Sequence, residues 1–224
     1  MDARRLPATV LAAAADRRGG AAEVAARAVD GLLEVAADPP LLEQAVAVLL
    51  AGQPAMAPIW HLARAARGPD PPAALAALRG RLHADADAAV ATATGWLRER
   101  LAATPGAVAT VSHSSLVDRV LRALGHGGPP APVVGVVGAD AIGPAALLNA
   151  AGTRELAARL PTLVVATAVK LVPAEVFDRL GGPGFELVPL EGLTAVVVGP
   201  EVLSPAEAGR RAAALAEGGG HGVA

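Results

Sequence analysis

The sequence predicts an α/β protein in which an N-terminal helical domain precedes a domain built on a mainly parallel sheet. From Asp2 to about Ala103 the chain is rich in Ala and has few β-branched runs, which favours helices. After Thr104-Pro105-Gly106, continuous apolar runs alternate with helical stretches, which indicates a parallel sheet covered on both faces. We expect a helical domain over residues 1–104, the sheet domain over 105–217 and a disordered tail over 218–224.

The helical domain is predicted from apolar residues at three- and four-residue steps, interrupted by proline. Helices are expected at 24–35, at 41–49, from near Pro54 or Pro58 to before Gly68, and from about 72 to 103. Proline suits these starts because its missing N–H is not needed in a first helical turn.

The N-terminal apolar run, Leu6 to Ala15, has the wrong flanks for a signal peptide. It is short, and Asp16-Arg17-Arg18 follows where a cleavage site needs small residues. We interpret it as the first helix of a soluble protein. No stretch approaches the ~18 uncharged apolar residues of a membrane span. We therefore expect no membrane partner and a cytoplasmic location.

The sheet domain is predicted from short apolar runs that end at turn residues. Strands are expected at 107–111, 132–137, 162–168 and 194–198, and helices at 115–124, at 153–160 and from Ser204 onward. Ser204 and Glu207 have the spacing of a capping box, which favours a helix start at that point.

Composition limits the possible functions. Hydrophobic residues make up 53% of the chain but aromatic residues only 2%, so the core must consist of Ala, Leu and Val. The chain has no Cys, which excludes disulfides and thiolate metal sites. A net charge of −2 gives no electrostatic case for binding nucleic acid. All but one of the 19 basic residues are arginines, and the exception is Lys170.

Ser112-His113-Ser114-Ser115 is the first candidate site, because it follows a predicted strand and opens a helix. Backbone N–H groups at a helix N-terminus, together with three hydroxyls, can hold a phosphate. The alternative is that Ser114 or Ser115 simply caps the helix.

Further candidates follow the next two predicted strands, where ligands bind in open parallel sheets. Asp140 can serve as a general acid or base or hold sugar hydroxyls, or it can stabilise a turn. Asn149 is a polar candidate, Gly152 allows close backbone approach, and Thr153 can cap the next helix. Lys170 follows the third strand and is expected in the same cleft as Asp140.

The sequence contains no evidence for a metal or cofactor. His61, His83 and His126 have no ligand spacing with one another or with paired carboxylates. There is no glycine-rich dinucleotide fingerprint. We therefore predict a site without metal or cofactor.

Five short segments between residues 50 and 205 stand in a specific order. They are Pro54-Ala-Met-Ala-Pro-Ile59, Ser112-His-Ser-Ser-Leu-Val-Asp-Arg-Val-Leu121, Gly138-Ala-Asp-Ala-Ile142 with Asn149 and Gly152-Thr153, Ala168-Val-Lys170, and Phe185-Glu-Leu-Val-Pro189 with Leu193-Thr-Ala195. In this order they resemble the superfamily of translation initiation factor 2B regulatory subunits and 5-methylthioribose-1-phosphate isomerase. The chain resembles a shortened, divergent member.

The resemblance implies a Rossmann-like C-terminal domain, a homodimer formed through it and a phosphorylated small-molecule ligand. The superfamily includes guanine-nucleotide-exchange subunits and isomerases that interconvert an aldose 1-phosphate and a ketose. Carried over, Asp140 would be the acid/base carboxylate and Ser114 would take the place of the catalytic cysteine, with His113 assisting. Asn149 would contact the substrate, and Ser112, Ser115, Gly152, Thr153, Lys170 and Gln53 would complete the binding site.

Three departures weaken the resemblance to an enzyme. Ala150 replaces the family's lysine and Gln53 its arginine, and only Gly125 to Pro132 joins the first helix to the Gly-Ala-Asp strand. A parallel crossover needs a dozen or more residues, so a strand–helix unit and part of the phosphate-binding wall are missing. Two hypotheses follow: a non-catalytic or weakly active dimer that binds a sugar phosphate or nucleotide, or an aldose–ketose isomerase acting on a phosphorylated pentose.

Overall fold

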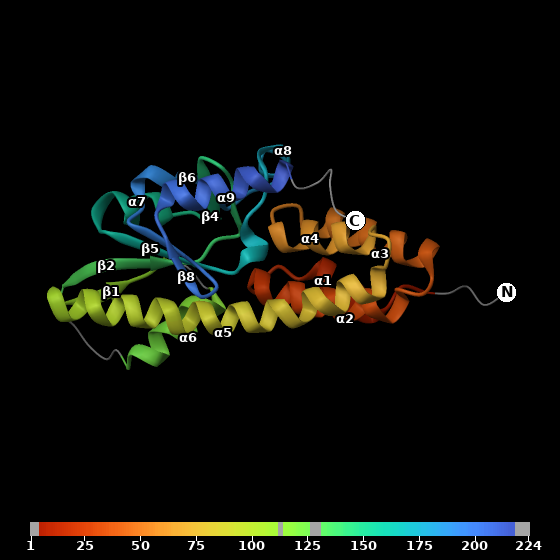
Figure 1. Cartoon of the computed structure of the whole chain (residues 1–224), viewed down its shortest axis with the longest axis horizontal. Helices are drawn as coiled ribbons and strands as arrows, with labels where there is room; N and C mark the ends of the chain where they lie inside the picture. The colour runs from red at the N-terminus through yellow and green to blue at the C-terminus, as the bar shows by residue number, and fades with distance from the viewer. Residues whose placement is uncertain (1–4, 112–113, 126–130, 218–224) are drawn as a thin grey trace.

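The computed structural model describes residues 5–111, 114–125 and 131–217. Its helical part comprises α1 (Ala8–Ala15), α2 (Ala21–Val35), α3 (Pro39–Gly52), α4 (Ala57–Ala66) and α5 (Pro71–Ala103), which confirms the predicted helices. Asp38 and Asp70 cap α3 and α5, with their side chains accepting hydrogen bonds from the N–H groups of Leu41 and Ala73. In Figure 1, α1 to α4 gather around one end of α5.

The main sheet has five strands in the order β1, β2, β5, β7, β8. The strands β1 (Ala107–Ala109), β2 (Pro132–Val137), β5 (Thr162–Ala166) and β7 (Ala195–Val198) are parallel, and β8 (Glu201–Leu203) is an antiparallel edge strand. The helix α6 (Ser115–Leu124) connects β1 to β2. Among the described residues, β2 is the next element after α6, and it pairs in parallel with β1.

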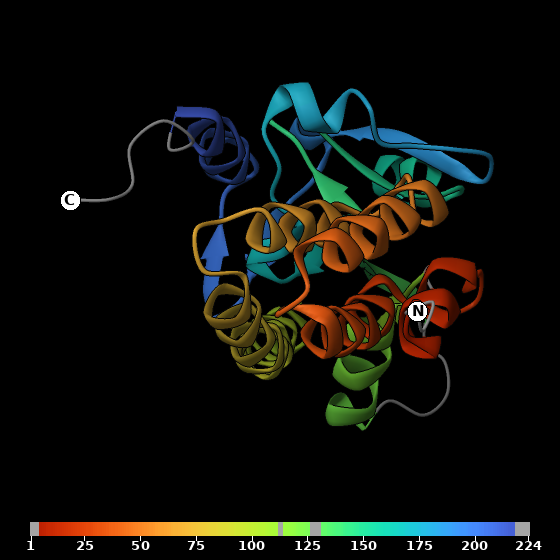
Figure 2. The same ribbon diagram turned by 90° about the vertical axis from the view of Figure 1, so that its right-hand side faces the viewer.

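Both faces of the main sheet are buried, which explains its continuous apolar strands. One face, with Val134, Leu163 and Val197, packs against α5 and α6. The other face, with Val137, Val164 and Val196, packs against α7 (Thr153–Arg159) and α9 (Pro205–Glu217). Figures 1 and 2 show this three-layer arrangement from two sides. The predicted α/β architecture is confirmed.

A second, antiparallel sheet was not predicted. It consists of β3 (Ala141–Ile142), β4 (Ala146–Ala150) and β6 (Phe185–Pro189), in that order. The register pairs Asn149 with Glu186, so the strand that carries Asn149 depends on a partner far away in the sequence. The short elements η1 (Ala168–Lys170), α8 (Ala174–Phe177) and η2 (Leu190–Gly192) complete the chain between β5 and β7.

The long helix α5 packs against both halves of the molecule. Leu75, Leu78 and Leu82 lie in the core formed with α1 to α4. Further along, Ala89, Ala93 and Leu97 lie against the main sheet. The domain boundary predicted at residue 104 stays a prediction, because the helix that ends there is shared by both cores.

Two expectations from the sequence are wrong. The sequence predicts apolar surface for a dimer at Thr194–Val198, on the ground that so small a sheet cannot cover this strand alone, but β7 is buried along its length and pairs with β5 and β8. We expected Thr153 to cap a helix, but the N-cap of α7 is Gly152. The capping hydrogen bond of α7 comes from Glu186 on β6, whose carboxylate accepts from the N–H of Arg154 at 2.8 Å.

At the last helix, half of the predicted capping box is present. The hydroxyl of Ser204 accepts from the N–H of Glu207 at 3.2 Å, whereas the carboxylate of Glu207 pairs with Arg210 and Arg211.

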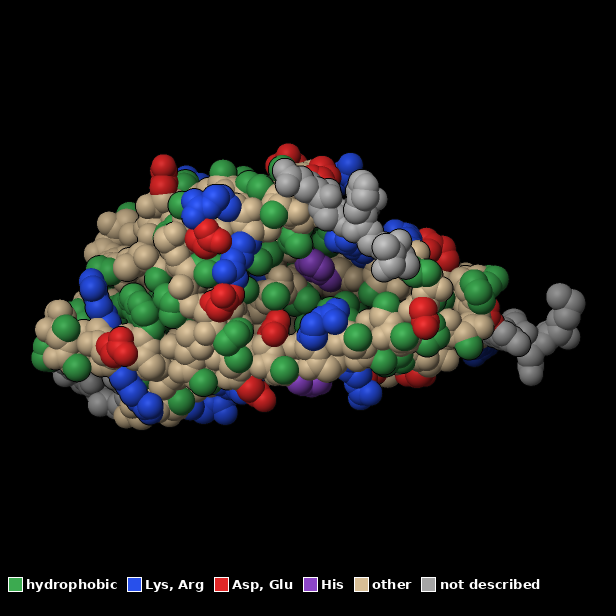
Figure 3. All heavy atoms as spheres, viewed as in Figure 1, with side chains coloured by type: hydrophobic (Ala, Val, Ile, Leu, Met, Phe, Trp, Pro, Cys, Tyr) green, Lys and Arg blue, Asp and Glu red, His purple; other side chains and the backbone are tan. Residues whose placement is uncertain are grey.

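Within the described ranges, no helix is long and apolar enough to cross a membrane. Acidic and basic side chains are interspersed on the face shown in Figure 3. The predicted disordered tail, 218–224, lies outside the described residues.

Candidate functional site

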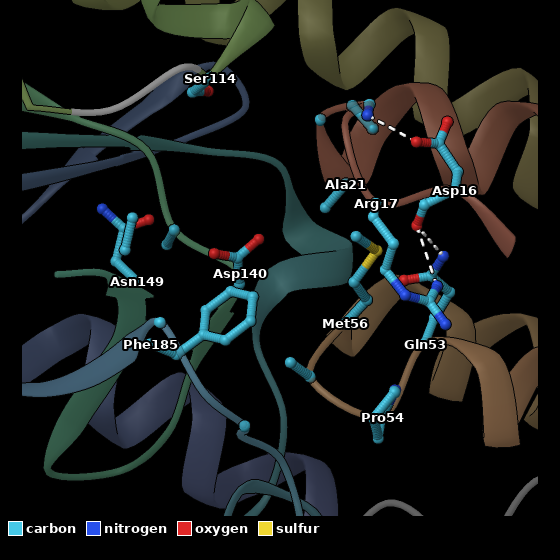
Figure 4. Close-up of a pocket in the computed structure, with 18 of the residues that line it drawn as sticks. Asp16, Arg17, Ala21, Gln53, Pro54, Met56, Ser114, Asp140, Asn149 and Phe185 are labelled. Carbon is cyan, nitrogen blue, oxygen red and sulfur yellow. Dashed lines mark hydrogen bonds between the residues drawn. The ribbon is translucent and has the colours of Figure 1, made fainter. Parts of the chain in front are cut away.

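A cavity of about 630 Å³ lies between the helical part and the carboxyl ends of the parallel strands. Its walls come from the α1–α2 loop, the end of α3, the start of α6, the segment after β2, and η1. Among the predicted residues, those that line it are Gln53, Ser114, Ser115, Asp140, Asn149 and Lys170. In Figure 4, Asp140 and Asn149 lie across the cavity from Arg17 and Gln53. The expectation that Lys170 shares a cleft with Asp140 is confirmed.

Two helix N-termini meet at one side of this cavity. Gly20 is the N-cap of α2, Ser114 is the N-cap of α6, and neither helix has a side-chain capping hydrogen bond. They approach so closely that a Cβ on Gly20 would lie 3.6 Å from the hydroxyl oxygen of Ser115. The first N–H groups of a helix have no partner within it and carry partial positive charge. Together they form a setting for an anion.

The alternative that a serine merely caps α6 loses support. Ser114 occupies the N-cap position, but its hydroxyl makes no capping hydrogen bond. Both Ser114 and Ser115 line the cavity instead. Ser112 and His113, predicted with them, lie outside the described residues.

The α1–α2 loop contributes residues that the sequence analysis missed. Asp16 accepts hydrogen bonds from the N–H groups of Arg18 and Gly19, each at 2.7 Å, and pairs with Arg27. These bonds, led by those from Gly19 and Arg18, lower the pKa of Asp16 to about 2. The loop is thereby held so that Arg17, Arg18 and Gly20 face the cavity. An Asp followed by two Arg and two Gly was the available signal.

Gln53 has a structural task at the cavity wall. Its side chain is 6% exposed, and its amide nitrogen donates to the carbonyl oxygens of Ala13 at 2.7 Å and Asp16 at 2.7 Å. These carbonyls lie at the end of α1, where the Arg17 guanidinium also donates to the carbonyls of Ala14 and Asp16. The amide nitrogen therefore holds α1 against α3 and donates to main-chain carbonyls.

Asp140 is fixed by its main chain and leaves its carboxylate available. Its N–H donates to Leu148 at 2.9 Å, and its carbonyl accepts from the N–H of Ala57 at 3.2 Å. Within the described part of the chain, no hydrogen bond or ion pair engages the carboxylate. Burial raises the pKa of Asp140 above its usual 3.8, and the Lys170 ammonium partly opposes the rise. A raised pKa favours the protonated form of this carboxyl more than in an exposed Asp, which suits it to proton exchange with a ligand.

Lys170 is buried, with 4% of its surface exposed, although its side chain lines the cavity. Burial lowers the pKa of Lys170 from its usual 10.5 to about 8, an effect that the nearby Asp140 opposes. The two groups attract each other but form no ion pair within 4 Å among the residues that the structure describes. They can therefore both act on a ligand between them.

Asn149 lines the cavity, whereas Thr153 lies behind it. The amide nitrogen of Asn149 donates to the hydroxyl of Thr153 at 3.0 Å, and that hydroxyl donates to the carbonyl of Ala150 at 2.8 Å. Thr153 is fully buried and so orients Asn149. Gly152, which has a φ of +97°, shapes the turn between the two.

The wall opposite the helix N-termini includes Phe185 and the glycine-rich segment 181–184. The sequence analysis used Phe185 only as part of a motif, because nothing local indicated that it faces a cavity. Among the described residues, no group of three or more His, Asp or Glu could hold a metal ion. The cavity therefore offers cationic, carboxyl and amide groups with one aromatic ring.

Solved structures share this fold. Translation initiation factor eIF-2B of Pyrococcus horikoshii OT3 aligns over 90% of this chain and 99% of its own, with a TM-score of 0.66 and 16% identity. The tetrameric eIF2B-beta2-delta2 complex from C. thermophilum aligns over 93% of each chain, with a TM-score of 0.67 and 14% identity. The 5-methylthioribose 1-phosphate isomerase of P. horikoshii OT3 aligns over 93% of this chain and 86% of its own, with a TM-score of 0.58 and 16% identity.

No family model matches the sequence, and no curated protein matches it. The structural matches confirm the predicted resemblance at the level of the fold. One fold hosts many activities, so the fold alone does not define the function of this chain.

The buried Lys170 leads to a prediction about stability. Lys170→Met should raise the free energy of unfolding at pH 7 by on the order of 3 kcal/mol, since each pKa unit corresponds to about 1.4 kcal/mol. Burial disfavours the charged amine, so the cost is complete below pH 8 and declines as the pH rises from 8 toward 10.5. Urea unfolding of the wild type and of Lys170→Met at several pH values measures this difference in the free energy of unfolding. Arg159→Met on the exposed face of α7 is the control, and a Lys170→Met protein less stable than wild type at pH 7 would refute the prediction.

Proposed function

We propose that this chain, which has the fold of translation initiation factor 2B subunits and 5-methylthioribose-1-phosphate isomerase, binds a small phosphorylated sugar or nucleotide. It acts as a binding or interaction protein with little or no catalytic activity. One observation carries the proposal: the uncapped N-termini of α2 and α6 meet at the cavity wall. Two positive helix ends side by side favour an anion with several acceptor oxygens, which is what a phosphate supplies.

The phosphate end of the cavity also has guanidinium groups. Arg17 and Arg18 line it, and Arg17 is anchored through a hydrogen bond of 2.8 Å to the carbonyl of Ala14. Within the described residues the Arg18 guanidinium makes no hydrogen bond or ion pair, so this side chain can turn toward a ligand. A guanidinium–phosphate pair adds two parallel charge-assisted hydrogen bonds.

The far end of the cavity suits hydroxyl groups. Asp140 and Asn149 lie there, and Thr153 holds the amide of Asn149 in place. A carboxyl and an amide supply the acceptors and donors that neighbouring sugar hydroxyls need. A ligand that fits both ends has negatively charged oxygens at one end and hydroxyl groups at the other. A phosphorylated sugar or a nucleotide has both.

Three features support binding over turnover. Ser114 stands where the resemblance places a catalytic cysteine, and a hydroxyl is a far weaker acid than a thiol, whose pKa is about 8.5. Ala150 stands where the family motif has a lysine, so this position supplies no positive charge. Gln53 uses its amide on the carbonyls of α1, so it does not replace the arginine of the family motif. General acid–base groups each contribute roughly 10²–10⁴ in rate, so these losses remove most useful turnover.

Ligand affinity tests the proposal. Ribose 5-phosphate should bind at least tenfold more tightly than ribose in isothermal titration calorimetry. Arg18→Gln should weaken ribose 5-phosphate by roughly 1.5–3 kcal/mol, the range for a hydrogen bond to a charged group. Arg159→Gln, on the surface of α7, should leave the affinity unchanged. Equal affinities for ribose and its phosphate would overturn the proposal.

An aldose–ketose isomerase remains the second candidate, because Asp140 is well placed to move a proton. Its carboxylate faces the cavity, and burial raises its pKa above 3.8. In that reaction Asp140 would be the base, with Ser114 or His113 assisting.

We expect no ketose formation from methylthioribose 1-phosphate or ribose 1-phosphate when purified protein is followed by NMR. The reason is that Ser114, Ala150 and Gln53 replace groups that the chemistry requires. Ketose formation that disappears in Asp140→Asn would establish the isomerase instead. A rate unchanged in that variant would point to a contaminating enzyme.

The proposal includes a homodimer formed through the C-terminal domain. Leu187 on the edge strand β6 and Val202 on the edge strand β8 are 49% and 46% exposed. Unpaired sheet edges with exposed apolar residues favour association with another chain. The C. thermophilum structure is itself a tetrameric assembly. A role in translation and a cytoplasmic location rest on the resemblance alone.

Light scattering at micromolar concentration should give the mass of a dimer. Leu187→Lys should shift the mass toward the monomer, because it places a charge in the apolar contact. Leu11→Lys is the matched control: Leu11 is 50% exposed but lies on α1, in the helical part. A wild-type monomer, or a dimer disrupted only by Leu11→Lys, would contradict a C-terminal interface.

A further inference from the structure

We propose that Lys170 captures the carbonyl of an open-chain phosphorylated sugar as a reversible imine. This inference rests on the proposed function, since it assigns the chemistry at the end of the cavity remote from the phosphate. It goes further by requiring that the ligand carry an aldehyde or ketone. A cyclic or fully reduced sugar phosphate would bind without this bond.

The placement of Lys170 is unusual for a lysine. The chain has a single lysine among its 19 lysine and arginine residues, and this lysine lines the cavity. Its backbone is held in η1 by a hydrogen bond of 3.0 Å from its N–H to the carbonyl of Thr167. Val169 and Leu171 beside it are buried. Long charged side chains are almost never fully buried unless paired, and here the described residues supply no hydrogen bond or ion pair to the amine.

An amine does what a guanidinium cannot. Arginine keeps its charge and has no free lone pair, whereas a buried lysine can lose its proton and attack a carbonyl. With a pKa of about 8, roughly a tenth of Lys170 is neutral at pH 7. At the usual 10.5 the neutral fraction would be on the order of one in three thousand. Burial disfavours the charged amine and so raises the fraction of Lys170 that is neutral and can act as a nucleophile.

Asp140 provides the proton transfers that imine formation needs. The nitrogen lone pair of neutral Lys170 forms a bond to the carbonyl carbon, and the carbonyl oxygen gains a proton while the nitrogen loses one. Asp140 in its acid form then protonates the resulting hydroxyl, which leaves as water as the nitrogen lone pair forms the C=N bond. The iminium nitrogen finally returns its remaining proton to the Asp140 carboxylate, which restores the acid form. The balance is one amine and one carbonyl giving one imine and one water, with no oxidant or reductant.

The dimensions of the cavity allow both ends to act on one ligand. A volume of about 630 Å³ falls within the usual range of small-molecule sites, roughly 300–1,000 Å³. In Figure 4, Asp140 lies across the cavity from Arg17. A phosphate at the helix N-termini would hold the sugar chain so that its carbonyl end points to Lys170 and Asp140.

The test is reductive trapping on the full-length protein. Ribose 5-phosphate with sodium cyanoborohydride should add one sugar phosphate per chain, and peptide mapping should place it on Lys170. Ribitol 5-phosphate, which has no carbonyl, should compete for binding and slow the trapping. The lysine introduced by Arg159→Lys measures ordinary glycation at an exposed position, and it should react at least tenfold more slowly than Lys170.

Each outcome separates the two proposals. If both sugar phosphates bind by calorimetry but Lys170 gains no adduct, or reacts no faster than the lysine introduced by Arg159→Lys, the imine is refuted while the binding function stands. If neither sugar phosphate binds, the binding function fails and the imine fails with it. Binding of both, with selective trapping at Lys170 that ribitol 5-phosphate suppresses, supports the inference.

Discussion

The cavity depends on the close approach of two helix N-termini, those of α2 and α6. Each carries about half a positive charge, so bringing them together is unfavourable until an anion lies between them. Gly20 lies so near Ser115 that a Cβ at position 20 would be in van der Waals contact with it, at 3.6 Å from the hydroxyl oxygen. A phosphate between the two helix ends would offset this repulsion, and our proposal of an anion site rests on that.

Several contacts, some within the helical part and some between the two halves, hold these helix ends in place. Gln53 fastens the end of α1 to α3, and Asp16 shapes the loop that leads into α2. The N–H of Ala57 at the start of α4 donates to the carbonyl of Asp140, and His61 bonds to the carbonyl of Leu171 at 2.8 Å. The long helix α5 packs against both cores and makes the halves one framework. Hydrogen bonds and packing therefore fix both the helical wall and the sheet wall of the cavity in place.

Local signals were sufficient for much of this fold. The bounds of α6 and β2 follow from apolar runs bracketed by Gly and Pro, and Asp140 and Lys170 were placed together because parallel strands end at one edge. The antiparallel sheet was missed because β4 finds its partner β6 some 35 residues later, a pairing that no local pattern reveals. Arg17 and Arg18 were missed because exposed arginines in a loop resemble ordinary surface residues.

The assignment of Gln53 shows the limit of motif reasoning. Its position in the Pro54 motif indicated ligand binding, but the structure shows its amide donating to main-chain carbonyls. A residue at a motif position can line the wall of a site while its side chain stabilises the fold through main-chain hydrogen bonds. Only the contacts of the folded chain distinguish the two cases.

The most direct measurement is an NMR titration of the isotopically labelled protein with ribose 5-phosphate, following backbone amides. Our account predicts that the largest saturable shifts occur at Ala21 and Ala22 of α2 and at Ser115 and Leu116 of α6, with the phosphorus resonance moving in step. Saturable shifts confined to other parts of the chain, or none at millimolar ligand, would contradict the claim that these two helix ends form a phosphate site.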